Sequence, residues 1–154
     1  MLKEISNYIP FILIPFMGWG VSHYLKKKND FNALKKITLS IGLIAFFVTE
    51  MTRSFWRPFV YKNEIFDYYF SDTIGNSFGT ITAIFMLLTM VGKGNKQDWK
   101  LILLVIIGLI VYEYMGYPSK FDFNDVIATI IFGIISLFSY LTLLKNKSII
   151  NASS

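Results

Sequence analysis

The chain has 154 residues, enough for one domain, and its lack of cysteine excludes disulfides, thiolate metal sites and cysteine nucleophiles. Hydrophobic residues make up 54% of it and charged residues only 16%, against roughly 25% in soluble domains, and the apolar residues fall in long runs, so we expect lipid to be its solvent. The formal net charge of +5 does not indicate a nucleic-acid partner, because the lysines form short clusters between apolar runs, where they act as topology signals.

Five apolar runs approach the length of a membrane-spanning helix, which is about 20 residues with about 17 as a lower bound. In chain order they are about Tyr8 to Leu25, Ile37 to Arg53, Asp72 to Val91, Trp99 to Tyr114 and Phe123 to Leu144. The first run lacks the basic start and the small-residue cleavage site of a removed signal peptide, so we expect it to be retained. The second and fourth runs are long enough only if Glu50 and Glu113 lie inside them, near the membrane boundary. We therefore predict an all-α fold, a polytopic transmembrane bundle of about five helices.

Basic residues are divided unevenly between the two ends of these helices. With five spans, one side carries the loops 26–36 and 92–100 and the tail after Leu144, with ten of the fifteen basic residues. Because cytoplasmic loops carry the excess of Lys and Arg, we expect the amino terminus outside and the carboxy terminus in the cytoplasm. Eight of the ten acidic residues fall on the outer side, all except Asp30 and Asp98. Tyrosines gather at the same boundary, as expected of an interfacial aromatic belt: Tyr61, Tyr68, Tyr69, Tyr112, Tyr114 and Tyr117.

The chain also contains two similar segments. The segment from Thr49 reads T-E-M-T-R, then a connector, then S-D-T-I-G-N-S-F-G-T; the segment from Tyr112 reads Y-E-Y-M-G, then a connector, then N-D-V-I-A-T-I-I-F-G. In both, a helix ends with a glutamate, an aromatic-rich outer loop follows, and a new helix begins at an aspartate. Two spans per unit make this a parallel repeat of the kind known among transporters. We predict one transmembrane domain, 1–154, with a peripheral helix and cytoplasmic loop at 1–36 and repeat units at 37–92 and 99–144.

The repeat makes Glu50 equivalent to Glu113 and Asp72 equivalent to Asp125. Ionisable residues within spans are costly and usually mark a polar pathway or site, so these carboxylates are candidates for one ligand site. An alternative is that they only cap or end helices at a wet interface. The candidate ligand-binding residues are Glu50, Arg53, Arg57, Asp72, Asn76, Glu113, Asp122, Asp125 and Thr129.

Two further features of this region leave alternatives open. Arg53 and Arg57 either neutralise the carboxylates or receive a phosphate or carboxylate, and the carboxylates themselves are of the type that binds a hard cation. The spacing Gly75-x-x-x-Gly79 favours close helix packing over ligand contact. We assign no catalytic residue, no metal ligand and no cofactor.

The second unit resembles the VanZ-like family, small bacterial membrane proteins named for one associated with resistance to the glycopeptide antibiotic teicoplanin. The resemblance is carried by Glu113, the run F-D-F-N-D-V-I-A-T from Phe121, and Gly133. The family pattern is a helix-ending glutamate, often with a glutamine three residues on, then Asp-x-x-Asp followed by an asparagine and glycines. The first unit is similar through Glu50, Asp72, Asn76 and Gly79.

The chain departs from the family pattern at three positions. Arg53 and Gly116 stand where the two units would have the glutamine, and Thr129 stands where the second unit would have the asparagine. The resemblance covers roughly residues 45–140 and leaves the first predicted helix outside it. It implies a bacterial plasma membrane and a role in the cell envelope.

These features lead us to expect a non-enzymatic membrane protein that binds an envelope lipid, an envelope precursor or a glycopeptide antibiotic at the outer acidic and arginine cluster and alters antibiotic susceptibility. Its partners would then be membrane lipids and that ligand, with no nucleic acid. The alternative is a small transporter or flippase that uses intramembrane carboxylates and works as a homo-oligomer, since five helices line at most a narrow path. An enzyme with paired carboxylates as acid and base is disfavoured, because the only histidine, His23, lies by the cytoplasmic lysines.

Overall fold

The computed structural model describes residues 2–68, 70–116 and 121–146. These residues form five long helices, one short helix and two single helical turns, and no strand occurs among them. In chain order the elements are α1 (Leu2–Lys27), α2 (Ala33–Met51), the π-helical turn η1 (Thr52–Trp56), α3 (Arg57–Lys62), α4 (Phe70–Val91), the 3₁₀ turn η2 (Lys96–Asp98), α5 (Trp99–Met115) and α6 (Phe123–Lys145). The predicted all-α fold is confirmed.

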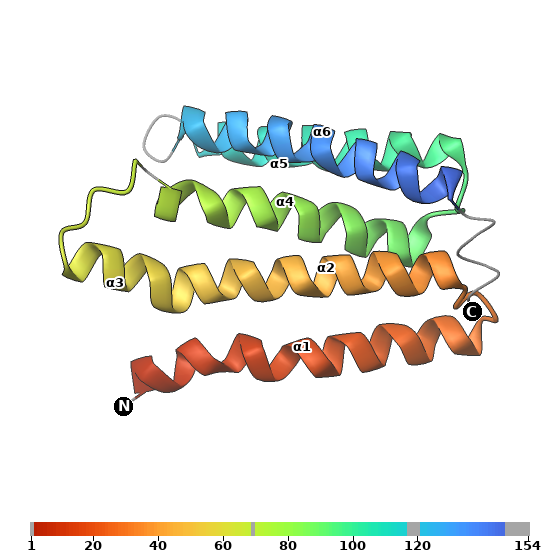
Figure 1. Cartoon of the computed structure of the whole chain (residues 1–154), viewed down its shortest axis with the longest axis horizontal. Helices are drawn as coiled ribbons and strands as arrows, with labels where there is room; N and C mark the ends of the chain where they lie inside the picture. The colour runs from red at the N-terminus through yellow and green to blue at the C-terminus, as the bar shows by residue number, and fades with distance from the viewer. Residues whose placement is uncertain (1, 69, 117–120, 147–154) are drawn as a thin grey trace.

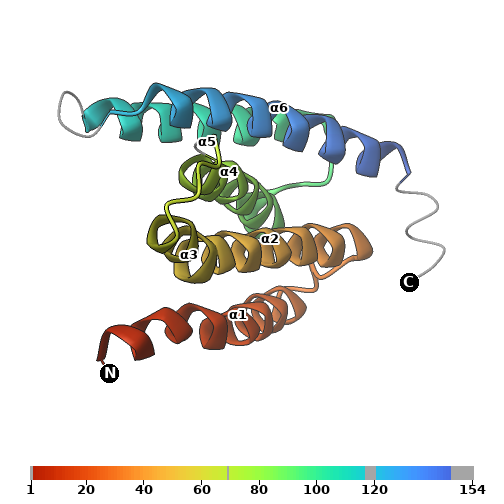
Figure 2. The ribbon, with the colours of Figure 1, turned by 60° about the vertical axis from the view of Figure 1, so that its left-hand side comes forward.

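The long helices lie side by side and alternate in direction (Figure 1). α1 packs on α2, α2 packs on α4, and α4 packs in turn on α5 and α6, which also pack on each other. A second view shows the same succession, with α1 at one edge and the α5–α6 pair at the other (Figure 2). α4 is therefore the central helix of the bundle, and it joins the hairpin α2–α4 to the hairpin α5–α6.

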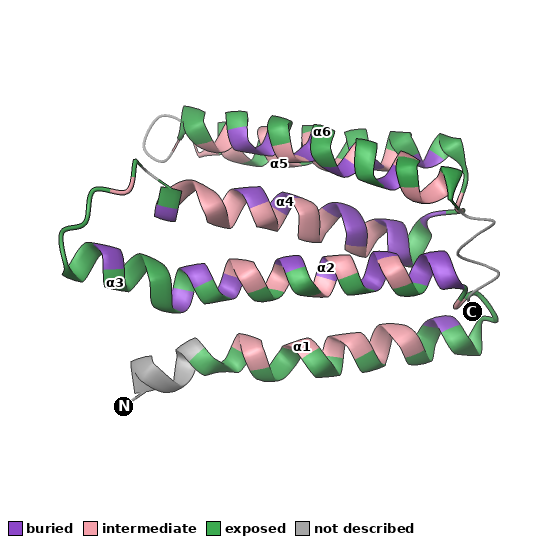
Figure 3. Cartoon of the chain, in the orientation of Figure 1, coloured by how far each residue is buried: buried purple, intermediate pink, exposed green. Residues whose placement is uncertain are grey.

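The buried apolar core is small and lies nearer one end of the bundle. It consists of Leu34, Ile84, Phe85, Leu88, Ile102 and Tyr140, contributed by α2, α4, α5 and α6. Figure 3 shows that burial is concentrated on α2 and α4, whereas α1, α5 and α6 are largely exposed or half-buried. The outer helices thus present most of their apolar side chains away from the bundle.

Three glycines allow close helix contacts, and they are not the ones that the sequence indicated. A Cβ on Gly18 of α1 would lie 2.9 Å from Leu43 of α2. A Cβ on Gly42 would lie 3.1 Å from Met86 of α4, and one on Gly133 would lie 2.5 Å from Ile106 of α5. A Cβ on Gly75 or Gly79 would meet no atom within 4 Å. The packing role predicted from the Gly75-x-x-x-Gly79 spacing is therefore wrong for the described chain, because no neighbouring helix approaches that face closely.

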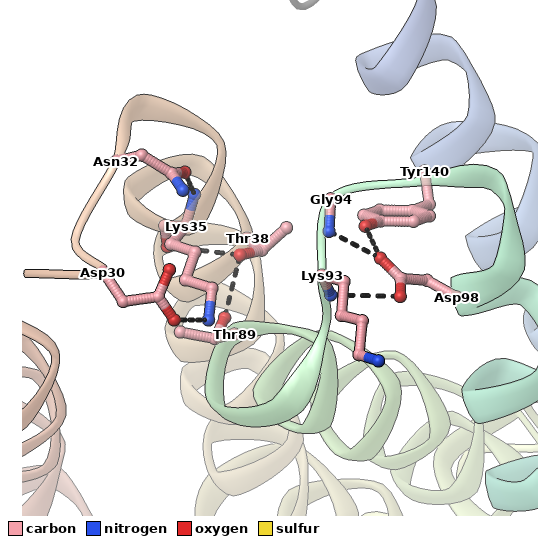
Figure 4. A network of polar contacts seen from close by, with 9 residues as sticks. All are labelled: Asp30, Asn32, Lys35, Thr38, Thr89, Lys93, Gly94, Asp98 and Tyr140. Carbon is pink, nitrogen blue, oxygen red and sulfur yellow. Dashed lines mark hydrogen bonds and ion pairs between the residues drawn. The ribbon is translucent and has the colours of Figure 1, made fainter. Parts of the chain in front are cut away.

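The end of the bundle that carries the lysine-rich loops, called the lysine end below, is closed by two polar networks (Figure 4). Buried Lys35 lies 2.5 Å from Asp30, and its backbone N–H donates to the Asn32 side chain that caps α2. Thr89 of α4 donates to Thr38 of α2 at 2.9 Å. These contacts tie the start of α2 to the end of α4.

The second network centres on the Asp98 carboxylate, which is only 4% exposed. Its oxygens accept hydrogen bonds from the backbone N–H groups of Lys93, Gly94 and Asn95 at 3.0, 2.8 and 3.2 Å. Tyr140 of α6 donates to the same carboxylate at 2.5 Å. Asp98 therefore organises the whole connection between α4 and α5 and links it to α6 (Figure 4).

Two helices of the described chain are long and apolar enough to cross a membrane by length and composition. They are α4 and α6, with mean hydropathies of 1.6 and 2.3 in their most apolar stretches. α5 has 17 residues, which at about 1.5 Å per residue is shorter than the roughly 30 Å hydrocarbon core. α2 includes three charged side chains, those of Lys35, Lys36 and Glu50.

Candidate functional site

A polar cavity of about 510 Å³ opens at the end of the bundle opposite the lysine end, where α2 passes into α3 and where α4 and α6 begin. Seven of the nine candidate residues line it: Glu50, Arg53, Arg57, Asp72, Asn76, Asp122 and Asp125. The other lining residues are Thr49, Thr52, Tyr61, Ser71 and Gly75. Side chains that lie up to 76 residues apart in the chain therefore surround one volume.

The first wall of the polar cavity is a helix that continues beyond its predicted end at Arg53. The π-helical turn η1 follows α2, and α3 extends the helical path to Lys62. Pro58 lies in the first turn of α3, where its missing N–H and fixed φ are tolerated. The aromatic-rich outer loop that we predicted here is therefore helical in its first part. Turns of the π type occur frequently at functional sites.

This continuous helix places Glu50, Arg53, Arg57 and Tyr61 at intervals of three or four residues, so they share one face. The Glu50 residue is 5% exposed, and its Oε2 lies 2.9 Å from Nη2 of exposed Arg53. That contact is an ion pair by distance but lacks hydrogen-bond alignment, so Oε2 has no hydrogen-bond donor in the described chain. Glu50 is the most buried carboxylate of the polar cavity.

Arg57 connects the first wall to α4. Its Nη2 lies 2.6 Å from Oδ1 of Asp72, and its Nε donates to the Tyr61 hydroxyl at 3.2 Å. The Tyr61 hydroxyl in turn donates to Asp72. The hydrogen bond with Tyr61 raises the pKa of Arg57 above its ordinary value, burial opposes that rise, and the Asp72 charge adds to it, so the guanidinium stays charged. Tyr61, which we expected in an aromatic belt, is thus also a polar lining residue.

The second wall is built by α4 and the start of α6. Asn76 of α4 and Asp125 in the first turn of α6 line this side of the polar cavity together. Asp122 caps α6, because its Oδ1 accepts from the backbone N–H of Asn124 at 2.8 Å. The helix-capping interpretation that we left open therefore applies to Asp122, which also lines the polar cavity.

Two candidate residues do not line the polar cavity. Glu113 accepts a hydrogen bond from the backbone N–H of Asp122 at 3.1 Å and so supports the start of α6 from α5. Thr129 is 6% exposed and is buried within the bundle one turn beyond Asp125. Glu113 and Glu50, equivalent in the sequence repeat, thus make different contacts: one binds a backbone amide and the other an arginine.

Among the described residues, the lining of the polar cavity carries four carboxylates and two guanidinium groups, a net charge of −2. Glu50 and Asp72 are paired with Arg53 and Arg57. In the part of the chain that the structure describes, no ion pair joins Asp122 or Asp125 to a basic side chain. Within the same residues, no group of three or more His, Asp or Glu side chains is arranged to hold a metal ion.

An apolar groove of about 680 Å³, called the aromatic groove below, lies at the same junction. It is lined by Met51, Thr52, Phe55, Trp56, Phe59, Phe70 and Ile74. Thr52 lines both the groove and the polar cavity. Sequence reasoning missed this groove because it depends on η1 and α3 being helical; the aromatic run F-W-R-P-F from Phe55 was the available signal.

The chain matches no family of known proteins, no curated protein and no solved structure.

Proposed function

We propose that this chain is a VanZ-like protein of the bacterial plasma membrane that binds an envelope lipid, an envelope precursor or a glycopeptide antibiotic in the polar cavity and thereby alters antibiotic susceptibility. The observation that carries the proposal is the meeting of Glu50, Arg53, Asp72, Asn76 and Asp125 around one volume. Buried carboxylates are rare unless they are paired or functional. A binding protein is the simplest use of such a cavity.

The exposed apolar surface supports the membrane setting and the five-span arrangement. α5 is almost wholly apolar, yet Ile102 is its only buried residue, and Leu104 is 64% exposed. Large apolar side chains are exposed on α1 and α6 as well, among them Phe16 and Phe138. Soluble monomers rarely expose contiguous apolar patches larger than a few hundred Å². Lipid is the medium in which such a surface is stable.

The orientation follows from the same arrangement. The connections from α1 to α2 and from α4 to α5, which carry the lysine clusters, lie at one end of the bundle, and α3 lies at the other (Figure 1). Arg57 and Tyr61 of α3 line the polar cavity, so the cavity lies at the end opposite the lysines. With cytoplasmic lysines the polar cavity faces outward, where cell-envelope precursors and antibiotics are encountered. The hairpins α2–α4 and α5–α6 then enter the membrane with the same orientation, as a parallel repeat requires.

The chemistry of the lining supports binding over catalysis. The polar cavity is lined by no histidine and no cysteine, and two of its carboxylates are neutralised by arginines. A general acid or base acts best with a pKa near the working pH and free access to the reacting group. Glu50 and Asp72 are held by arginines and are not free to reach a reacting group, so we propose a non-enzymatic role.

A small oligomeric transporter or flippase is the second candidate, favoured by buried polar side chains along α2 and α4. Glu50 is buried at one end and Lys35 at the other, and Ser77, Thr80 and Thr89 of α4 are buried between them. The hydroxyls of Ser77 and Thr80 donate to carbonyls of their own helix, and that of Thr89 donates to Thr38, so a transport path would require these hydrogen bonds to be broken. Movement of protons or cations into vesicles that contain the purified protein would favour this candidate.

The first test is susceptibility to a panel of envelope antibiotics, including teicoplanin, in bacteria that express wild type, Glu50→Gln or Asp125→Asn at matched membrane abundance. Glu64→Gln is the matched control, since it removes an exposed carboxylate of the same end that does not line the polar cavity. We expect resistance to be lost in the first two variants and kept in the control. Equal susceptibility of wild type and empty vector would refute the proposal.

A further inference from the structure

The polar cavity and the aromatic groove lie on adjacent faces of the same two helical segments. Neighbouring residues of the chain line one or the other: Glu50 the cavity and Met51 the groove, Ser71 the cavity and Phe70 the groove. Thr52 lines both. A charged compartment thus adjoins an apolar one, which is the pattern that an amphiphile with a polar head and an apolar chain would match.

The charge of the polar cavity determines the sign of the head group. Both arginines that line it are engaged with carboxylates, Arg53 with Glu50 and Arg57 with Asp72. An anionic head would have to displace these carboxylates and enter a lining of net charge −2. A cationic head meets Asp125, for which the described residues supply no ion-pair partner. Electrostatic complementarity therefore favours a cation.

An independent observation indicates that a polar head group fits at the cavity wall. Ser71 lines the polar cavity, is 3% exposed, and its Oγ has no hydrogen-bond partner among the described residues. Buried polar atoms are usually hydrogen-bonded, so an unsatisfied hydroxyl at a cavity wall marks a place for a ligand. Oε2 of Glu50 lies 2.9 Å from Nη2 of Arg53 but has no aligned hydrogen-bond donor. An alkylammonium group carries three N–H donors and no acceptor, which suits these two oxygens.

We propose that the polar cavity and the aromatic groove together bind one cationic amphiphile. Its ammonium head lies against Asp125, Glu50 and Ser71, and its alkyl chain lies along Phe55, Trp56 and Ile74. This inference rests on the proposed function, since it names the ligand class of the same site. It narrows the ligand to a molecule with an amine and an apolar chain, and it assigns the aromatic groove a role in selecting the chain.

The test uses the fluorescence of Trp56, the only one of the three tryptophans that lines the aromatic groove. Trp19→Phe and Trp99→Phe leave it as the sole indole in the full chain, reconstituted in phosphatidylcholine nanodiscs. The probes are 12-bromododecylammonium and 12-bromododecyl sulfate, which carry the same quenching bromine and chain but opposite head charges. We expect the ammonium probe to quench Trp56 at a concentration about tenfold lower than the sulfate probe requires, or lower still. A tenfold difference in affinity is what one charge-assisted hydrogen bond provides.

Two variants separate the head from the chain. Asp125→Asn with Glu50→Gln should abolish the preference for ammonium, whereas Phe55→Ala should weaken quenching by both probes without changing the preference. Glu64→Gln is the control and should behave as the unmodified background. Equal quenching by the two probes, or a preference that survives the double substitution, would overturn the inference.

The binding test and the cellular test fail in different ways. If the ammonium probe is preferred but antibiotic susceptibility does not change in the Glu50→Gln variant, the binding site is supported and the proposed envelope function is refuted. If antibiotic susceptibility depends on Glu50 but the ammonium and sulfate probes quench equally, the proposed function is supported and the ligand is not a cationic amphiphile.

Discussion

Arg57 of α3 binds Asp72 in the first turn of α4, with Nη2 2.6 Å from Oδ1. The two residues belong to different helices, and the contact fixes the extension of α2 over the start of α4. Tyr61 supports it with a hydrogen bond to each partner. This pair therefore sets the shape of the polar cavity.

Loss of the pair should loosen α3 more than it destabilises the whole protein. Both side chains are partly exposed, so we expect Arg57→Gln to cost less than about 1 kcal/mol. Backbone amides of α3 should nevertheless exchange hydrogen faster, because the ion pair that joins α3 to α4 is lost. Mass spectrometry of hydrogen exchange measures this, with Lys62→Gln as the control on the same helix. If Arg57→Gln and Asp72→Asn have fully additive effects, the contact does not couple the helices.

Glu50 and Glu113 should differ in function even though the sequence makes them equivalent. Glu50 lines the polar cavity, whereas Glu113 binds the backbone of Asp122. We expect Glu50→Gln to change antibiotic susceptibility more than Glu113→Gln at equal abundance. Minimum inhibitory concentrations in parallel strains check this. A larger effect of Glu113→Gln would show that the site lies nearer the second hairpin.

The connection between α4 and α5 should be sensitive to acid. Burial opposes the charge of Asp98, but hydrogen bonds from Tyr140 and from the backbone of Lys93, Asn95 and Gly94 outweigh it and lower the pKa of Asp98 below its ordinary value. A lowered pKa in the folded state adds stability above the unfolded value of about 3.9, and this stability is lost as the pH falls through the folded pKa.

Hydrogen-exchange protection factors of residues 92–98 should therefore be constant from about pH 5 to 8 and fall below about pH 4. Asp98→Asn should lower protection at neutral pH, since the backbone donors lose a charged acceptor worth about 1.5 to 3 kcal/mol. Tyr140→Phe removes one stabilising hydrogen bond and should move the acid transition to higher pH. An acid transition unchanged by Tyr140→Phe would mean that another group controls it.

Substitutions at two glycines should have opposite effects on stability. Gly133→Ala would place a methyl group 2.5 Å from the Ile106 side chain and should lower the melting temperature in detergent. Gly79→Ala meets open space and should raise it, because alanine in a helix is favoured over glycine by about 1 kcal/mol. Ile106→Val in the Gly133→Ala background should restore part of the loss. Equal melting temperatures for the two alanine variants would contradict the packing described for α5 and α6.

The helices and part of the polar cavity could be predicted from local sequence patterns. Apolar runs and their charged boundaries predicted a helix from Asp72 to Val91, where the structure has Phe70–Val91, and one from Phe123 to Leu144, where it has Phe123–Lys145. Residues spaced three or four apart on one helix share a face, so the grouping of Glu50 with Arg53 was already implied. These features are local, and local spacing is sufficient to predict them.

The packing of the whole bundle determines which helix faces meet. It brought Asp125 to Asn76 but kept Thr129 and Glu113 off the polar cavity, and it added Tyr61 and Ser71. It also placed the close helix contacts at Gly42 and Gly133, although Gly75 and Gly79 had the more suggestive spacing. The physical reason is that contact between helices depends on where they cross and how far each extends, and this is set by all side chains of the interface together.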